Sequence, residues 1–295
     1  MVNYVSSSLT VVVPVHKMAG RLGLLMGWLS EIEQHRLSTK VVIVEDGMDY
    51  ETLAQLEQVR KFPFVEILSG VFDSPGLARN YGLSLVRTEW VAFWDSDDTP
   101  NPTLIQKELD RVPIEKTVLI GAFQTLNTQA NTKTSIHVPK NLNSVALNPG
   151  LWRFVFRKSR LGSIKFTLHR MGEDQVFLSA LNLRGHECEF SDSLFYSYTL
   201  GNSSQLTQSG EAIKEIRATI FEFINVIRKQ NGQVANYSLI MFFKILLTGL
   251  KVYAVKPLDV FVIVAKSFWT SPRLLMRLLT ISLFVFRNSL YRRGI

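Results

Sequence analysis

Two groups of acidic residues stand out in the first third of the sequence. One is Asp95-Ser96-Asp97-Asp98 and the other is Glu45-Asp46-Gly47. Each group directly follows a short run of apolar, β-branched or aromatic residues, which is the pattern of a buried strand. Carboxylates that end neighbouring strands repel one another unless a cation or hydrogen-bond donors compensate them. The two groups therefore predict a ligand site that contains a cation.

A divalent metal suits the chemistry of these acids. Hard carboxylate oxygens are preferred ligands of Mg²⁺ and Mn²⁺, and such an ion can bridge the two phosphates of a nucleoside diphosphate. One alternative stays open for residues 95–98. They can form a solvated turn that caps a helix starting near Asn101-Pro102, because acidic turns before helices are common.

The surrounding pattern indicates an open, doubly wound α/β sheet, mostly parallel, with helices on both faces. Strands are expected at 9–15, 40–44, 64–68 and 90–94, and helices at 22–32, 51–60 and from residue 75. Such strand-helix-strand units take right-handed crossovers. Ligands of these sheets bind outside the carboxyl ends of the strands, where both acidic groups are expected.

Two other phosphate-binding motifs are missing from the sequence. It contains no GxxxxGK[ST] loop, and Pro14-Val15-His16 stands after the first strand where GxGxxG would be. A P-loop NTPase and a nicotinamide dehydrogenase are therefore disfavoured.

Taken in order, the motifs resemble those of the family 2 glycosyltransferases, which have the GT-A fold. The matching segments are VVVPVH at 11–16, VEDG at 44–47, PGLARNYGL at 75–83, WVAFWDSDD at 90–98 and GEDQVF at 172–177. FYSYTLGNSSQLT at 195–207 is similar to the family's closing segment. Each motif alone is weak, but the ordered set is specific.

The resemblance implies roles for individual residues. Asp174 would be the catalytic base, and Asp97 would bind Mn²⁺ or Mg²⁺. The residues expected to contact substrates are Pro14, His16, Glu45, Asp46, Arg79, Asp95, Glu173 and Trp152. Asp46 would accept a hydrogen bond from the nucleobase with Glu45 beside it. Arg79 would approach the donor phosphates, and Asp95 the ribose or sugar.

Two of these assignments have structural alternatives. Glu173-Asp174 can be the ordinary acidic first turn of a helix over 175–183. Trp152 and the arginine after it can be a buried tryptophan beside a solvated basic face, rather than part of an acceptor site.

The implied reaction is an inverting displacement. The acceptor hydroxyl must lose its proton as it attacks, so a carboxylate within about 3 Å of that oxygen is needed. The metal and Arg79 would stabilise the leaving nucleoside diphosphate. The family's Asp-Asp-Gly-Ser turn is Glu45-Asp46-Gly47-Met48 here, so uridine is expected only by family habit. The Gln-x-x-Arg-Trp pattern of processive synthases is absent, which favours addition of a single sugar.

Basic charge is concentrated at the C-terminal end. Residues 1–210 carry 20 Lys and Arg against 21 Asp and Glu, whereas residues 211–295 carry 13 against 4. This division suggests a catalytic domain over 1–210 and a basic helical region over 211–295. It argues against a nucleic-acid partner of the main domain and for an anionic partner of the tail. The single cysteine, Cys188, excludes an internal disulfide and a cysteine-based zinc site.

The tail is apolar as well as basic. Its charge-free runs, such as 278–286, are shorter than the roughly 20 residues of a spanning helix. Helices lying in the surface of an anionic membrane are expected, divided into three pieces by Pro257 and Pro272. The alternative is a helical subdomain packed on the catalytic domain or on a dimer partner. The apolar run at 9–15 is too short for a signal peptide, so the expected location is the cytoplasmic face of a membrane.

These observations predict a metal-dependent transfer of one sugar from a nucleotide sugar to a membrane-proximal glycan or polyprenyl-linked acceptor. Two other functions stay open. A nucleotidyltransferase can use a similar sheet and metal, and a non-catalytic, membrane-bound protein can bind glycans without turning them over.

Overall fold

A computed structural model describes residues 8–18, 20–127, 132–200, 210–230, 233–251, 258, 276–277 and 280–285. The chain forms two compact units. The first consists of Met1–Pro139, Gly150–Leu168 and His186–Ser203, and the second of Lys140–Pro149, His169–Gly185 and Ser204–Ile295. Two short segments that precede the predicted boundary at residue 210 thus belong with the C-terminal helices.

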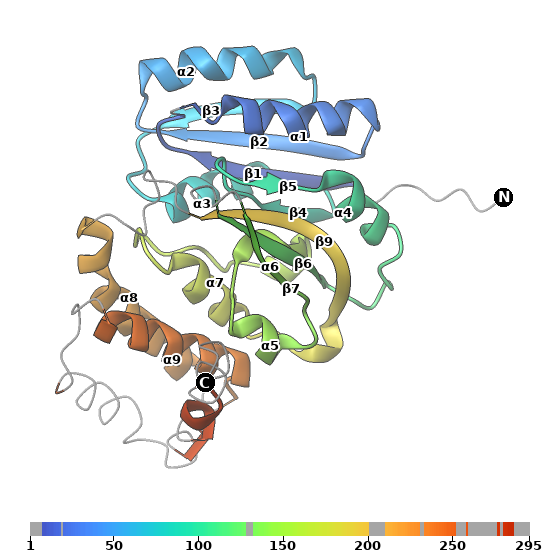
Figure 1. Cartoon of the computed structure of the whole chain (residues 1–295). Coiled ribbons are helices and arrows are strands. Elements are labelled where there is room, and N and C mark those ends of the chain that lie inside the picture. The colour runs from blue at the N-terminus through green and yellow to red at the C-terminus, as the bar shows by residue number, and fades with distance from the viewer. Residues whose placement is uncertain are drawn as a thin grey trace. The chain divides into compact units, whose positions relative to one another are not determined.

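The first unit contains a nine-stranded sheet in the order β3-β2-β1-β4-β8-β6-β9-β5, with β7 paired to β6 (Figure 1). The strands are β1 (Leu9–Val15), β2 (Thr39–Asp46), β3 (Val65–Gly70), β4 (Trp90–Phe93), β5 (Thr99–Pro100), β6 (Val118–Asn127), β7 (Thr132–His137), β8 (Phe154–Arg157) and β9 (Cys188–Leu200). Strands β3, β2, β1 and β4 are parallel neighbours. Because β8 is antiparallel to both β4 and β6, strand β6 and its parallel partner β9 run in that same direction. The predicted α/β class with a mostly parallel sheet is confirmed.

Helices cover both faces of this sheet, as its apolar strands require. They are α1 (Leu22–Gln34), α2 (Tyr50–Leu56), α3 (Pro75–Leu85), α4 (Pro102–Leu109) and α6 (Lys158–Leu161), with 3₁₀ turns η1 (Glu57–Lys61), η2 (Leu151–Arg153) and η3 (Gly185–Glu187). Val11 and Val13 of β1 share a buried cluster with Leu29 of α1. Val12 points to the other face, where Gly82 of α3 lies against it.

The second unit is helical. It contains α5 (Leu142–Ala146), α7 (Glu173–Leu181), α8 (Gly210–Lys229) and α9 (Asn236–Lys251). The hydroxyl of Tyr237 on α9 donates to the carbonyl of Leu178 on α7 at 2.6 Å, and the ring of Phe242 lies 5.7 Å from that of Phe223 on α8. Helix α9 is therefore packed inside this unit.

This packing changes the interpretation of the tail. Most of the apolar residues of α9 that were expected to enter a membrane are buried against α5, α7 and α8. For this helix the packed-subdomain alternative fits better. The predicted breaks at Pro257 and Pro272 lie outside the described residues. Within the part of the chain that the structure describes, no helix is long and apolar enough to span a membrane.

The close contact of α3 with the sheet can be tested at Gly82. A Cβ atom there would lie 2.5 Å from Cγ1 of Val12 and 3.1 Å from Cγ2 of Val44. We expect Gly82→Ala to lower the free energy of unfolding by about 1–3 kcal/mol, because overpacking outweighs the better helix propensity of alanine. Denaturant unfolding measures this change.

Gly27 of α1 provides the matched control, since a Cβ built there meets no described heavy atom within 4 Å. Gly27→Ala should raise the free energy of unfolding by about 0.5–1 kcal/mol. If both variants shift stability in the same direction, the close packing of α3 on the sheet is wrong.

Candidate functional site

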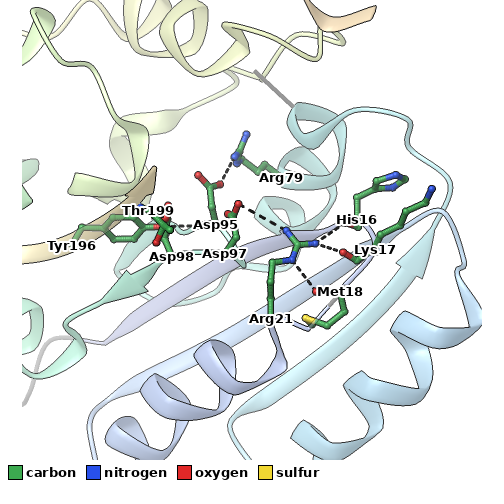
Figure 2. A network of polar contacts seen from close by, with 10 residues as sticks. All are labelled: His16, Lys17, Met18, Arg21, Arg79, Asp95, Asp97, Asp98, Tyr196 and Thr199. Atoms are coloured by element: carbon green, nitrogen blue, oxygen red, sulfur yellow. Dashed lines mark hydrogen bonds and ion pairs between the residues drawn. The ribbon is translucent and has the colours of Figure 1, made fainter. Parts of the chain in front are cut away.

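The strands that carry the predicted site residues end at one edge of the sheet. Val15 of β1 pairs with Glu45 of β2, and Val12 of β1 pairs with Phe93 of β4, all in parallel register. The residues that follow these strands therefore emerge together, as predicted. Figure 2 shows the acidic turn after β4 facing the loop that follows β1.

Two arginines compensate the acidic turn (Figure 2). Nη2 of Arg79, on α3, donates to Oδ1 of Asp95 at 2.7 Å. Nη1 of Arg21, at the start of α1, lies 4.0 Å from Oδ2 of Asp97. The side chains of Asp95 and Asp97 are 31% and 18% exposed, so both remain accessible to a ligand. The protein itself thus supplies part of the positive charge that the sequence pattern requires.

Burial is the main influence on the pKa values of Asp97 and Asp98. Burial and the neighbouring Asp95 raise the pKa of Asp97, while Arg21 lowers it. Asp98 is almost completely buried, and its Oδ1 accepts a hydrogen bond from the Thr199 amide at 2.8 Å. Burial and then the two nearby carboxylates raise the pKa of Asp98 well above its usual range.

Strand β9 holds the acidic turn from the side opposite the arginines. The hydroxyl of Tyr196 accepts a hydrogen bond from the Asp95 amide at 3.0 Å. A hydrogen bond from the same hydroxyl lowers the pKa of Asp98 and offsets part of the effect of burial. Tyr196 also pairs with Pro100 of β5. Tyr196 lies in the segment 195–207 that resembles the family's closing segment, but the motif by itself indicates no role for this residue.

The helix-capping alternative for the acidic turn is not supported. Helix α4 is capped by Asn101, whose side chain accepts a hydrogen bond from the Leu104 amide at 3.0 Å. The carboxylates of residues 95–98 are therefore not needed to cap that helix.

The acidic pair after β2 is oriented by the backbone. Glu45 is fully buried, and its carboxylate accepts hydrogen bonds from the amides of Met48 at 3.2 Å and Asp49 at 2.9 Å. Glu45 therefore stabilises the turn between β2 and α2. Both of its carboxylate oxygens are used by this turn, and a contact of Glu45 with the substrate stays a prediction.

The carboxylate of Asp46 also accepts hydrogen bonds from backbone amides, and these follow the neighbouring strand β3. Its Oδ1 accepts hydrogen bonds from the amides of Phe72 at 2.6 Å and Asp73 at 3.0 Å, just after β3. Nδ1 of His16 lies 2.8 Å from the Asp46 carbonyl oxygen, so the end of β1, which includes Pro14, is fixed beside it.

Trp152 lies in a buried aromatic cluster. Its ring stacks on that of Tyr196 at 4.5 Å between centroids and meets Phe123 edge to face at 4.6 Å. The next residue, Arg153, is also buried and donates from Nε to the carbonyl of Gly121 at 2.8 Å. Burial lowers the pKa of Arg153 to about 9. Trp152 is thus buried, as the structural alternative expects, but Arg153 is not part of a solvated face; a role of Trp152 in binding the acceptor stays a prediction.

Glu173 and Asp174 begin α7, which belongs to the second unit. The preceding Gly172 is left-handed, with φ of 80°, and a Cβ there would lie 2.6 Å from Cδ1 of Ile245. Oδ1 of Asp174 accepts a hydrogen bond from the Gln175 amide at 2.8 Å, as an acid in a first helical turn does. Their catalytic and substrate-binding roles stay predictions.

The acids of the turn fit a metal that is shared with phosphates. Among the described residues, no group of three or more His, Cys, Asp or Glu side chains is placed to hold a metal ion. Mg²⁺, however, is usually bound by one or two carboxylates together with substrate phosphates and water, rather than by an all-protein cage. Asp97 and Asp95 offer such a partial set of oxygen ligands.

The chain is similar to known glycosyltransferases over most of its length. The model of the family "Glycosyl transferase family 2" matches residues 10–171. The succinoglycan biosynthesis protein ExoO of Rhizobium meliloti (strain 1021) is 24% identical over 196 residues, which make up 59% of this chain. That match spans 56% of ExoO, little more than half of its length.

Solved structures share the fold at low sequence identity. Residues 1–349 of S. aureus TarS superpose with a TM-score of 0.64 and 18% identity, covering 98% of this chain and 92% of that one. The same protein with UDP-GlcNAc gives a TM-score of 0.65 at 16% identity, with 97% and 92% covered. The mannosyltransferase PcManGT of Pyrobaculum calidifontis, in complex with GDP-Man and Mn²⁺, gives 0.59 at 14%, with 97% and 82% covered.

These structures confirm the predicted GT-A fold, and at such identities they show the fold alone. The family model goes further, because it matches more than half of the chain and includes the acidic turn and Arg79. The chain belongs to the family "Glycosyl transferase family 2".

Proposed function

We propose that the protein is an inverting, metal-dependent enzyme that transfers one sugar from a nucleoside diphosphate sugar to a membrane-proximal glycan or lipid-linked acceptor. The observation that carries this proposal is the pair of accessible carboxylates, Asp95 and Asp97, held by arginines at the ligand edge of the sheet. Two structural neighbours, one in complex with UDP-GlcNAc and the other with GDP-Man and Mn²⁺, support a nucleotide sugar as donor. We propose a uridine nucleotide on the basis of the family resemblance alone.

In this proposal Asp97 holds Mn²⁺ or Mg²⁺, which would neutralise the charge on the leaving diphosphate, and Asp95 contacts the ribose or sugar. Arg79 orients Asp95 through their 2.7 Å hydrogen bond and adds positive charge at the same edge. Asp46 is fixed by the amides that follow β3 and accepts a hydrogen bond from the nucleobase. The nucleotide sugar is thereby held at its nucleobase and at its diphosphate.

Asp174 is proposed to remove the proton from the acceptor hydroxyl. A single base and a metal-assisted leaving group give inversion at the anomeric carbon, and no separate acid is required. This assignment rests on the match of residues 172–177 to the family's motif.

The acceptor is proposed to be a growing cell-surface polysaccharide at the cytoplasmic face of a membrane. The name of the relative ExoO, a succinoglycan biosynthesis protein, supports a polysaccharide product. The excess of basic residues after residue 210 and the exposed side chains of Leu258, Met276 and Leu283 support contact with an anionic membrane. Helix α9 is left out of this proposed contact, because most of its apolar residues are buried.

The first test is incubation of the protein with Mn²⁺, a panel of nucleotide sugars and membrane lipid extracts. Release of nucleoside diphosphate together with a glycosylated product supports transfer and identifies the base and sugar. Release of pyrophosphate would instead indicate a nucleotidyltransferase. Binding of glycans without turnover of any nucleotide sugar would indicate a non-catalytic binding protein.

Asp97→Ala tests the metal assignment. We expect it to abolish the Mn²⁺-dependent part of nucleoside diphosphate binding in calorimetry, because the ion loses its main protein ligand. Asp192→Ala removes an exposed acid of β9 and should bind like the parent. Equal binding by the parent and Asp97→Ala would show that Asp97 is not a metal ligand.

Asp174→Asn tests the base. Donor binding should be nearly unchanged, while turnover should fall by roughly 10²–10⁴-fold, the usual contribution of a general base. Steady-state rates and calorimetry separate the two effects, and Asp192→Asn controls for the loss of one acid. Turnover within twofold of the parent would remove Asp174 from the mechanism.

Leu283→Asp tests membrane contact. The parent should sediment with anionic liposomes, less with neutral ones, and should be partly released by high salt, which screens charge but not apolar burial. Leu283 is 71% exposed, and its replacement by Asp should weaken sedimentation. Ile114→Asp, at an 88% exposed position of the first unit, should not. Equal sedimentation of both variants would argue against contact through the tail.

A further inference from the structure

Arg21 carries a positive charge that is held in place beside Asp97 (Figure 2). Its Nε donates to the carbonyl of Met18 at 2.8 Å, and its Nη2 donates to the carbonyls of His16, at 2.9 Å, and Lys17. Nη1 is then the nitrogen that faces Asp97, at 4.0 Å from Oδ2. The guanidinium thus binds three successive carbonyls with one side and a site carboxylate with the other.

The loop that supplies these carbonyls is itself anchored. The Met18 amide donates to Oγ1 of Thr52 at 2.8 Å, and Nδ1 of His16 lies 2.8 Å from the Asp46 carbonyl oxygen. Lys17 adopts a left-handed conformation with φ of 53°, which is uncommon for a residue other than glycine. If the Arg21 side chain moved away, each of the three loop carbonyls would lose a hydrogen bond, although the Met18 carbonyl would keep the one from the Arg21 backbone amide. Its charge is therefore a fixed part of the site.

A fixed guanidinium has opposite effects on a free metal ion and on a metal already bound to phosphates. The side chains of Arg21 and Asp97 are 12% and 18% exposed, so bulk solvent screens their charges only partly. A bare divalent cation that binds Asp97 is repelled by Arg21 at close range. A complex of that cation with a diphosphate has no net positive charge, and its phosphate oxygens can accept hydrogen bonds from the guanidinium.

We propose that Arg21 is the resident counter-ion of Asp97 and makes metal binding depend on the diphosphate. Without donor, Arg21 neutralises Asp97 and keeps the affinity for free metal low. With donor, metal and diphosphate bind together, and Arg21 is a positioning residue for the phosphates. This inference rests on the proposed function, because it takes Asp97 as the metal ligand.

The test is a titration of the full chain with Mn²⁺ alone, in which calorimetry measures the binding affinity. We expect Arg21→Gln, which keeps a donor but loses the charge, to bind Mn²⁺ about tenfold more tightly than the parent. Arg21→Lys, which keeps the charge, should stay within about twofold of the parent. Arg60→Gln is the control: it removes one exposed arginine from η1, before β3 and away from the carboxyl edge. It should leave Mn²⁺ affinity unchanged. The tighter Mn²⁺ binding of Arg21→Gln should be lost in the double variant that also carries Asp97→Asn.

Three results would overturn the inference. The first is a folded Arg21→Gln protein, judged by thermal unfolding without metal, that binds Mn²⁺ no more tightly than the parent. The second is Arg21→Lys behaving like Arg21→Gln. The third needs no variant: the parent should bind Mn²⁺ at least about tenfold more tightly when inorganic pyrophosphate is present, and equal affinities contradict the coupling.

Failure of this inference can be told from failure of the proposed function. If sugar transfer requires Mn²⁺ and Asp97 but Arg21→Gln does not bind Mn²⁺ more tightly, only the counter-ion role is wrong. If Arg21→Gln binds Mn²⁺ more tightly while the parent transfers sugar without metal, the metal part of the proposed function is wrong.

Discussion

The site depends on one constraint: the negative charges of three carboxylates within four consecutive residues must be compensated. Asp95, Asp97 and Asp98 sit together at the end of a buried strand, where mutual repulsion is weakly screened. Donors from three separate elements make this arrangement possible: Arg79 of α3, Arg21 at the start of α1, and the Thr199 amide of β9. The sheet order brings these elements to one edge, so the fold and the charge distribution depend on each other.

Much of the first unit could be predicted, because its signals are local. Continuous apolar runs located β1 to β4, and the acids that follow them located the ligand edge. The later strands were harder, since β6, β8 and β9 mix parallel and antiparallel pairing and depend on partners far away in the sequence. The assignment of residues 140–149 and 169–185 to the helical unit follows from tertiary packing, which no local pattern encodes.

The roles of single side chains were the least predictable. A motif match cannot show that Glu45 uses its carboxylate on its own turn, that Trp152 is stacked in a buried cluster, or that α9 buries the residues expected to face lipid. Arg21 lies in no matched motif, and its importance follows only from its distance to Asp97. In each case the deciding information is which atoms meet in space, while the residue type alone allows several roles.

The two contacts between β9 and the acidic turn also bear on how this protein is made. Asp95 meets Tyr196, and Asp98 meets Thr199, each across 101 positions of sequence. Such distant contacts carry a loop-closure cost and form late. During synthesis the chain therefore emerges with its acidic turn exposed well before β9 leaves the ribosome. Until then the nascent first unit has strands β1 to β4 and both arginines but lacks the two β9 contacts with its most charged segment, so this turn is among the last parts of the site to become ordered.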